Sequence, residues 1–256
     1  MHIALSVIHA ALLCALALIP PAAAQTASPA APDPCAAPAD LTAQDTPLPA
    51  LQAAIKDAGT VNILAVGSGT MLGPETGSAD ASFPYRMVES MRTALPDVKF
   101  QLTVKGGKGV TAADMLTIMR DELAHTPYRL VLWQTGTVEA VRGLRPEDLY
   151  DTLAAGADLT GEHNADLVLI DPQFSRFLRA NANLDPYEDV LQRAASLPGV
   201  MLFHRYELMR YWVGQNRIDL ERAAKSEQRR TADVLHRCLG QALAAEILKG
   251  AARAAN

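Results

Sequence analysis

The sequence predicts a single α/β domain built on a parallel sheet of about five strands, with helices on both faces. The first observation is that short apolar runs alternate with segments of helical length from residue 51 onward. The second is that these intervening segments are long enough to return the chain for a parallel strand. The third is the absence of an internal repeat over a length that one core can serve. We therefore expect a three-layer α/β/α sandwich of the flavodoxin-like type.

Five strands are expected in order along this chain. The apolar runs predict strands at residues 62–66, 98–104, 130–133, 167–170 and 200–203. The second run, from Val98 to Val104, alternates strictly between apolar and polar residues, which is typical of a strand near a sheet edge. A short helix is expected before the first strand, at residues 51–58, and helices are expected between the strands at residues 85–95, 112–124, 146–159 and 186–197. Helices are also expected to fill the chain after the last strand, ending with residues 232–248.

The first residues carry the features of an export signal. An apolar stretch, residues 3–19, ends at two prolines, and Ala22-Ala23-Ala24 offers a small-residue cleavage site. We expect residues 1–24 to be a signal peptide, residues 25–50 a proline- and alanine-rich arm, and residues 51–256 the folded domain. An uncleaved membrane anchor is the alternative, because no Lys or Arg precedes the apolar stretch. The prediction is an exported protein, periplasmic or secreted, with no stable membrane span after cleavage.

The charge and the cysteine content of the chain limit the classes of binding partner and the cellular compartment that we expect. All charged residues follow residue 24, and the formal net charge of −5 gives no basic footprint for nucleic acid. Cys35 and Cys238 remain after signal removal, and an even count in an exported chain predicts a disulfide between them. Two unrelated free thiols are the alternative. Because the sequence lacks Cys-x-x-Cys and His-Glu-x-x-His, we expect no metal site.

The residues just after each predicted strand are the first site candidates, because ligands of parallel sheets bind at the carboxyl ends of the strands. Asp171 and His204 could form a polar pair there or shape the pocket. The full set is Gly67-Ser68-Gly69, Lys105-Gly106-Gly107, Gln134-Thr135-Gly136-Thr137-Val138, Asp171-Pro172-Gln173 and His204-Arg205.

Near the end of the chain, Asp233 and His236 stand three residues apart at the predicted start of the last helix. A catalytic histidine needs a carboxylate on Nδ1, and an acid one helical turn earlier could supply it. The same spacing also suits Asp233 as a helix cap and His236 as a surface residue. Spacing alone leaves both interpretations open.

The glycines after the first strand also suggest a second class of site, a phosphate loop. Gly67, Gly69 and Gly73 follow a strand, but their spacing has one residue too many for Gly-x-Gly-x-x-Gly. Lys105 stands where a ribose-binding acid is expected, and the turn from Lys105 to Gly109 lacks Walker A spacing. We therefore expect neither a nucleotide nor another cofactor.

Taken together, these pieces resemble the SGNH/GDSL hydrolase family over roughly residues 60–248. A glycine-rich turn follows strand one, glycine turns follow strands two and three, and Asp-x-x-His precedes the last helix. The most specific local match is Leu132-Trp133-Gln134-Thr135-Gly136-Thr137. The resemblance implies a nucleophile after strand one, oxyanion donors after strands two and three, and a histidine base oriented by its aspartate.

Several positions fit the family pattern. Gly67 matches the glycine before the nucleophile, and Gly107 matches the second-turn glycine whose N–H would hold the oxyanion. Gly136 matches the third turn, and Asp233 and His236 match the base and its orienter.

Two positions depart from the pattern at the chemistry itself. Ser68 takes the family's aspartate position, and Gly69 takes the nucleophile position, where it offers no oxygen to acylate. Val138 replaces the oxyanion asparagine, and losing one such donor typically costs about 10²–10³ in rate. Ser68 could serve in a shifted turn, or it could only cap the turn with its hydroxyl.

The resemblance implies ester hydrolysis or acyl transfer on small acyl or O-acetyl esters, including those of cell-envelope glycans. In a working version Ser68 would attack the ester carbonyl, His236 would take its proton, and Asp233 would orient His236. The alternative is a pseudoenzyme that keeps the fold and binds a glycan, an acyl ligand or a protein. Gly69 and Val138 favour this alternative, whereas the retained Asp233 and His236 favour the enzyme.

Overall fold

The computed structural model of the chain describes residues 33–42, 45–57 and 59–254. The predicted signal peptide, residues 1–24, and the first part of the predicted arm lie outside the described residues. Five parallel strands form one sheet in the order β2-β1-β3-β4-β5. They are β1 (Thr60–Gly67), β2 (Lys99–Gly106), β3 (Tyr128–Gln134), β4 (Asp166–Ile170) and β5 (Val200–Phe203).

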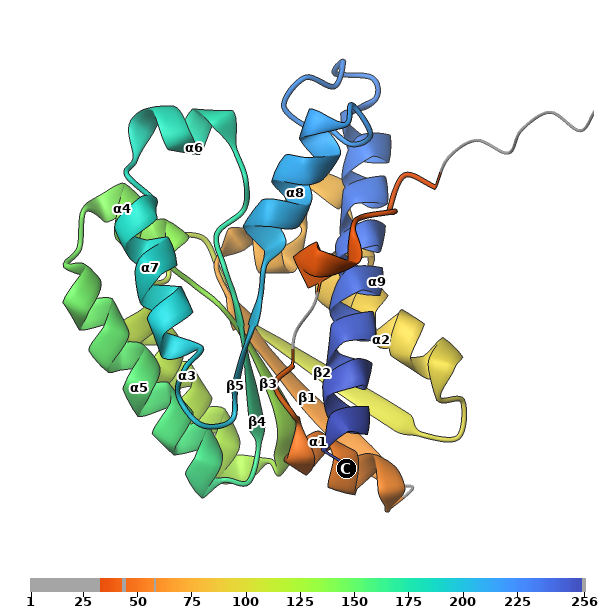
Figure 1. Cartoon of the computed structure of the whole chain (residues 1–256), viewed down its shortest axis with the longest axis vertical. Coiled ribbons are helices and arrows are strands. Elements are labelled where there is room, and N and C mark those ends of the chain that lie inside the picture. The colour runs from red at the N-terminus through yellow and green to blue at the C-terminus, as the bar shows by residue number, and fades with distance from the viewer. Residues whose placement is uncertain (1–32, 43–44, 58, 255–256) are drawn as a thin grey trace, which may run out of the picture. The chain divides into compact units, whose positions relative to one another are not determined.

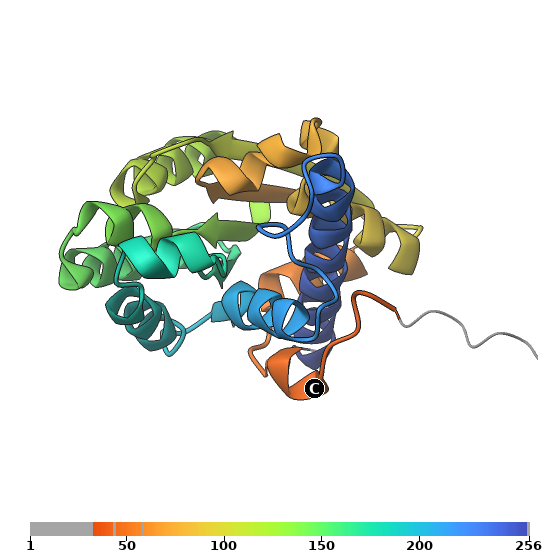
Figure 2. The ribbon, with the colours of Figure 1, turned by 90° about the horizontal axis from the view of Figure 1, so that it is seen from above.

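Helices cover both faces of this sheet, which confirms the predicted three-layer α/β/α fold (Figures 1 and 2). One layer contains α1 (Pro49–Lys56), α2 (Phe83–Ala94), α8 (Arg205–Gly214) and α9 (Gln228–Arg253). The other contains α3 (Ala112–His125), α5 (Pro146–Glu162) and α7 (Asp185–Ala194). None of the helices in the described part of the chain is both long and apolar enough to cross a membrane.

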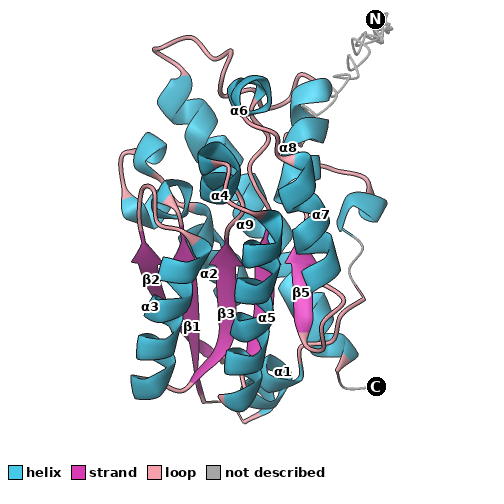
Figure 3. Ribbon diagram, turned by 90° about the vertical axis from the view of Figure 1, so that its left-hand side faces the viewer, coloured by secondary structure: helices cyan, strands magenta, loops and turns pink. Residues whose placement is uncertain are grey.

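Shorter elements gather beyond the carboxyl ends of the strands. Two short helices that the sequence does not predict, α4 (Thr137–Arg142) and α6 (Arg176–Asn181), lie at this end of the sheet (Figure 3). Three 3₁₀ turns between β1 and α2 complete the region: η2 (Gly69–Leu72), η3 (Pro74–Thr76) and η4 (Ala79–Ala81). A further 3₁₀ turn, η1 (Ala39–Thr42), precedes α1.

Alternation along the strands divides the core into two clusters, one under each helical layer. In β1, Ile63 and Ala65 pack under the layer of α2 and α9, whereas Leu64 and Val66 pack under the layer of α3 and α5. The inner strands β1, β3 and β4 are largely buried, as their continuous apolar runs predict, and so is β5 at the far edge of the sheet. By contrast, β2 lies at the sheet edge with part of its residues exposed, which confirms the edge position that its alternating pattern predicts.

Most helix boundaries differ from the prediction by a few residues, and for two of the helix starts the physical reason is clear. Helix α1 begins at Pro49 rather than at residue 51, since proline suits the first position of a helix. Helix α9 begins at Gln228 rather than at residue 232. Its first residues, Gln228-Arg229-Arg230, are polar but favour helix, so the helix extends beyond its apolar part. Asp233 and His236 therefore lie inside α9 and not at its start.

The predicted disulfide joins Cys35 to Cys238 across 203 residues of sequence. It connects the arm that precedes α1 to α9. Beside it, Arg217 donates from Nη1 to the carbonyl oxygen of Ala36 at 2.5 Å. The described part of the arm is therefore fixed to the helical layer that contains α9.

Candidate functional site

A chain of hydrogen bonds links residues at the carboxyl ends of β1, β3 and β5. Gln134, the last residue of β3, donates from Nε2 to Ser68 Oγ at 2.8 Å. Thr70 donates from Oγ1 to Gln134 Oε1 at 3.1 Å. Arg205 donates from Nη1 to Thr70 Oγ1 at 3.3 Å. Every bond runs in the same direction, so the hydroxyl of Ser68 accepts from Gln134 and keeps its own hydrogen for another acceptor.

The turn after β1 determines which side chain can serve as a nucleophile. Ser68 is 8 % exposed and directly precedes Gly69, the position where the family pattern predicts the nucleophile. Gly69 is not among the glycines with positive φ, and a Cβ there would meet Lys108 Cα at 3.7 Å, an ordinary contact. A serine therefore fits at Gly69 without backbone strain. Gly67 is tighter, because a Cβ there would lie 3.0 Å from Gln134 Cβ.

His236 is buried, and both of its ring nitrogens are engaged. The backbone N–H of Phe83 donates to Nδ1 at 2.9 Å. Nε2 lies 2.6 Å from Glu75 Oε1. Because an amide N–H can only donate, Nδ1 must be unprotonated and Nε2 must carry the hydrogen that Glu75 accepts. In this arrangement no ring nitrogen of His236 has a free lone pair.

Glu75, from the 3₁₀ turn η3, is the partner of His236 that sequence reasoning missed. Burial alone would raise the pKa of Glu75, but the hydrogen bond from His236 and the nearby Arg205 cation hold this pKa below its ordinary value. Glu75 is therefore ionised at neutral pH. The segment between Gly73 and Ser82 has no hydrophobic period and no motif, so the sequence offers no signal for this contact.

The structure does not join the predicted base, His236, to its predicted orienter, Asp233. Within the described residues, no hydrogen bond or ion pair joins Asp233 to His236, because Nδ1 already accepts from Phe83. No hydrogen bond in the described part joins His236 to Ser68 either, and the hydroxyl of Ser68 accepts from Gln134 instead. The half-buried Asp233 lies one turn before His236 on α9.

The predicted oxyanion positions are also engaged. Gly107 donates its N–H to the carbonyl oxygen of Gly67 at 3.0 Å, and this bond links the end of β2 to the end of β1. Gly136 donates its N–H to Glu139 Oε2 at 3.0 Å. Val138 lies half-buried in the first turn of α4. These N–H groups would have to leave their acceptors before they could hold an oxyanion.

Glu139 organises two of the turns at this edge of the sheet. Its buried carboxylate accepts from the N–H of Ala112 at 2.6 Å, at the start of α3, and from the N–H of Gly136. It also accepts from Thr135 Oγ1 at 3.3 Å. The signal for this role is an acid three residues after the turn glycine, the spacing of a helix N-terminal cap.

Arg205, which follows β5, is a buried cation in this region. It donates from Nε to the carbonyl oxygen of Asp171 at 3.1 Å, and it is 1 % exposed. Burial lowers the pKa of Arg205 to about 10, so it stays charged at neutral pH. Burial raises the pKa of Asp171 to about 8, although its carboxylate accepts from Tyr206 N–H at 2.8 Å. His204 Nδ1 lies 3.9 Å from Asp171 Oδ2, so the predicted pair of these residues is a loose one.

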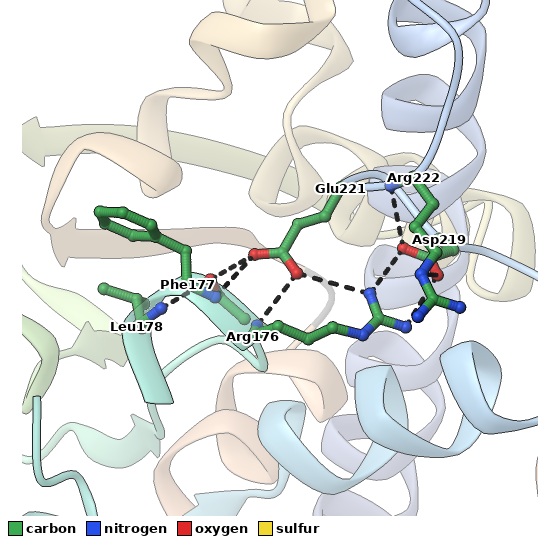
Figure 4. A network of polar contacts seen from close by, with 7 residues as sticks. Arg176, Phe177, Leu178, Asp219, Glu221 and Arg222 are labelled. Atoms are coloured by element: carbon green, nitrogen blue, oxygen red, sulfur yellow. Dashed lines mark hydrogen bonds and ion pairs between the residues drawn. The ribbon is translucent and has the colours of Figure 1, made fainter. Parts of the chain in front are cut away.

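A cavity of about 80 Å³ adjoins Glu75 at the same end of the molecule. Its apolar wall comes from Phe174, Met209, Val213, Ile218, Leu220 and Leu235. Figure 4 shows Arg176 reaching from the start of α6 toward Asp219 and Glu221 on the loop before α9. Arg176 donates to both oxygens of Asp219 at 3.0 and 2.9 Å. Glu221 in turn accepts from the backbone N–H of Arg176 at 3.0 Å, so two loops are joined over the cavity.

No group of three or more His, Cys, Asp or Glu side chains suited to a metal ion occurs in residues 33–42, 45–57 and 59–254.

Comparison with known proteins gives one family match. A family model described as the non-GDSL lipase-like family matches residues 34–253. No curated protein matches the chain at the significance required.

Solved structures of esterases share the fold. A two-domain esterase active on acetylated mannans, co-crystallised with mannopentaose, matches with a TM-score of 0.62 and 15% identity, over 81% of this chain and 55% of that chain. An acetyl-xylooligosaccharide esterase from Geobacillus Stearmophilus matches with a TM-score of 0.57 and 15% identity, over 73% of this chain and 94% of that one. The α/β hydrolase LAE5, from the metagenome of Lake Arreo in Spain, matches with a TM-score of 0.56 and 16% identity, over 75% of this chain and 95% of that chain. The predicted resemblance to SGNH/GDSL hydrolases is confirmed for the family and the fold.

Proposed function

The chain belongs to the non-GDSL lipase-like family, and on this premise we propose that it binds an acyl or O-acetyl ligand at the carboxyl edge of its sheet without hydrolysing it. The fold is that of a hydrolase of esters, and the site lies where such sheets bind their ligands. However, the hydrogen bonds at the site leave a hydroxyl that can donate to a ligand, but they leave His236 with no free lone pair that could accept a proton.

One observation carries this proposal, the engagement of His236. A general base needs an unshared lone pair within hydrogen-bond reach of the nucleophile's proton. His236 uses its lone pair on the N–H of Phe83 and gives its hydrogen to Glu75. In a serine triad the carboxylate binds Nδ1 and the serine binds Nε2, whereas here a backbone amide and Glu75 take those two places. Gly69, at the nucleophile position, adds to the same conclusion.

The ligand class rests on what the fold relatives bind. The two glycan esterases named above act on acetylated mannans and on acetyl-xylooligosaccharides. We propose the same chemical class for this chain, a small acyl or O-acetyl group carried by a glycan or by a small molecule. No nucleic acid and no cofactor is part of the proposal.

A low-activity esterase is the second candidate, and the chain of hydrogen bonds at Ser68 favours it. Gln134 holds Ser68 Oγ and leaves its hydrogen free, as a nucleophile requires. For turnover, His236 would have to release Phe83 and turn toward Ser68, with Asp233 as its orienter. The oxygen of Ser68 would then attack the ester carbonyl, and the proton would pass through His236 to the leaving alcohol.

Labelling with a serine-directed fluorophosphonate separates the two candidates. We expect the purified protein to form no adduct by intact mass, under conditions that label a control serine esterase. An adduct on Ser68 that disappears in both Ser68→Ala and His236→Ala would overturn the binding proposal and establish the esterase. A panel of short acyl esters, read by acid release, gives the same decision independently.

A designed variant tests the ancestry of the site. Gly69→Ser with Val138→Asn restores the family's nucleophile and oxyanion side chains, and the added Cβ at Gly69 meets no close contact. If the contacts of His236 are the obstacle, the double variant stays inert. Adding Glu75→Ala should not restore labelling, because Nδ1 still accepts from the backbone N–H of Phe83 and Nε2 keeps its hydrogen. Labelling of the double variant alone would contradict the role we give to the His236 contacts.

Export is a separate proposal, that the mature chain lies in the periplasm or outside the cell. The disulfide between Cys35 and Cys238 supports it, because such bonds persist in oxidising compartments. The apolar stretch before the two prolines supports it as well. Mass analysis of the protein purified from cells should show an N-terminus near Gln25, whereas a chain that keeps residues 1–24 would contradict signal cleavage.

A further inference from the structure

Arg205 has a donor that nothing in the described part of the chain satisfies. Its side chain is 1 % exposed, yet Nη2 has no hydrogen-bond partner there. Each of its other two nitrogens has a partner, with Nε on the carbonyl oxygen of Asp171 and Nη1 on Thr70 Oγ1. A buried donor without an acceptor costs free energy, and a charged one costs more. The unsatisfied Nη2 therefore destabilises the protein, and a bound ligand that accepts from Nη2 would remove this destabilisation.

The charge of Arg205 is not neutralised by a direct ion pair within the described residues. Asp171 contributes its backbone oxygen, and burial keeps its carboxyl largely protonated at neutral pH. Glu75 is the ionised group whose charge acts on Arg205, but its carboxylate is bound to His236. The guanidinium therefore has no hydrogen-bonded carboxylate of its own in the described part of the chain, and the charge of Glu75 disfavours a ligand that carries more than one negative charge.

The hydrogen-bond chain carries the influence of Arg205 to the end of β1. Arg205 donates to Thr70, Thr70 to Gln134, and Gln134 to Ser68. Bonds that run in one direction polarise each other, so a cation at the head makes the last hydroxyl a stronger donor. Ser68 is nearly buried, whereas Thr70 is half-buried and gives the chain a route to solvent.

We propose that this chain of donors binds the carboxylate of a monovalent organic acid, with Nη2 of Arg205 and the hydroxyl of Ser68 as the donors. The proposal rests on the ligand-binding function above and names the group that is recognised. A carboxylate suits the planar guanidinium, and its single charge suits the balance with Glu75. The source is either a free short-chain acid, the product of ester cleavage, or an acidic sugar within a glycan.

Titration calorimetry with sodium butyrate, sodium glucuronate and neutral methyl butyrate tests the proposal at constant ionic strength. We expect saturable binding of a carboxylate and weaker binding of the neutral ester. Butyrate binding identifies a free acid as the source, and glucuronate binding identifies an acidic sugar. Equal affinity for the ester, or no saturation with either acid, overturns the proposal.

Variants show whether binding uses the proposed donors. Thr70→Val removes the hydroxyl that links Arg205 to Gln134 and should weaken carboxylate binding by about tenfold or more. Thr93→Val is the matched control, because the exposed Thr93 hydroxyl bonds only within its own helix. Arg205→Lys keeps the charge and loses the guanidinium fork, so it should weaken binding as well. Unchanged affinity in Thr70→Val and Arg205→Lys contradicts the proposal.

A spectroscopic readout distinguishes recognition from a loss of folding. Butyrate or glucuronate should shift the NMR signals of the Gln134 side-chain amide, since that group donates to Ser68. The shift should vanish in folded Thr70→Val and persist in Thr93→Val. If ester turnover on Ser68 is found, the binding-without-hydrolysis proposal fails but carboxylate binding still stands. If the protein has no esterase activity and binds no carboxylate, the carboxylate inference fails and the proposal of binding without hydrolysis is retained.

Discussion

Glu246 should make the stability of the chain depend on pH. Its side chain lies in α9 with 3 % exposed, and neither carboxylate oxygen has a hydrogen-bond partner among the described residues. Burial raises the pKa of Glu246 from 4.5 to about 8, against a smaller opposing effect of Lys249. The folded protein therefore holds this carboxyl in its protonated form at neutral pH, whereas the unfolded chain releases the proton.

The magnitude follows from the two pKa values of Glu246. Between pH 4.5 and pH 8 the folded state binds more protons, so the stability that this proton provides is complete below pH 4.5 and is lost as pH rises through the window. The slope is about 1.4 kcal/mol per pH unit, which gives about 3 kcal/mol between pH 5 and pH 7.5. Glu246→Gln removes the titration and keeps the shape. Its stability relative to the parent should therefore rise by about 3 kcal/mol over this range.

Urea unfolding with the disulfide intact, followed by tryptophan fluorescence at several pH values, measures the difference. Asp166, whose pKa burial raises to about 6, contributes equally to both proteins and cancels. Asp171, whose pKa burial raises to about 8, repels an ionised Glu246, so its contribution cancels only where Glu246 is protonated. Glu162→Gln, at an exposed position of α5, is the control and should show no such trend. A difference between Glu246→Gln and the parent that stays constant with pH would refute the reasoning.

Three further predictions concern the parts that hold the site in place. Gly106→Ala should destabilise the protein by about 3 kcal/mol or more in urea unfolding, because the new Cβ would lie 2.0 Å from Gly67 O at a φ of +113°. Gly161→Ala, with nothing within 4 Å, should be neutral or stabilising, and equal losses in the two variants would contradict the packing argument. Glu139→Ala should cost about 2–4 kcal/mol, since two buried N–H groups lose their acceptor, and a loss below 1 kcal/mol would mean that water replaces the carboxylate. Reduction of the disulfide should lower the free energy of unfolding by about 2–5 kcal/mol, and an unchanged unfolding midpoint in reductant would count against a constraint across 203 residues.

The sequence was sufficient for the sheet and its helical layers because these depend on hydrophobic periodicity. The buried strands are continuous apolar runs and β2 alternates, so the strands and the edge position of β2 could be predicted. The edge position of β5 could not, because β5 is a buried apolar run like the inner strands. The short helices α4 and α6 escaped prediction, because six residues do not span two turns of a hydrophobic pattern.

The site could be predicted only in location. The strand-end argument identified Ser68, Gln134 and Arg205 as neighbours of a ligand, and the structure links all three. It could not predict that Glu75 reaches His236, because that contact joins an irregular turn to a helix 161 residues away. Nor could it identify Arg205 as buried, since an arginine after a strand is usually solvated and its burial depends on packing from several elements.

The bond between Cys35 and Cys238 imposes an order of events on biosynthesis. At typical rates of 5–20 residues per second, Cys238 is made roughly 10–40 s after Cys35. During that interval the nascent chain offers Cys35 a single thiol of its own, Cys14, in the segment predicted to be removed. Early oxidation could therefore produce only a non-native bond to Cys14 or a bond to another molecule. If residues 1–24 are removed before oxidation, Cys238 is the one cysteine within the chain with which Cys35 can form a disulfide.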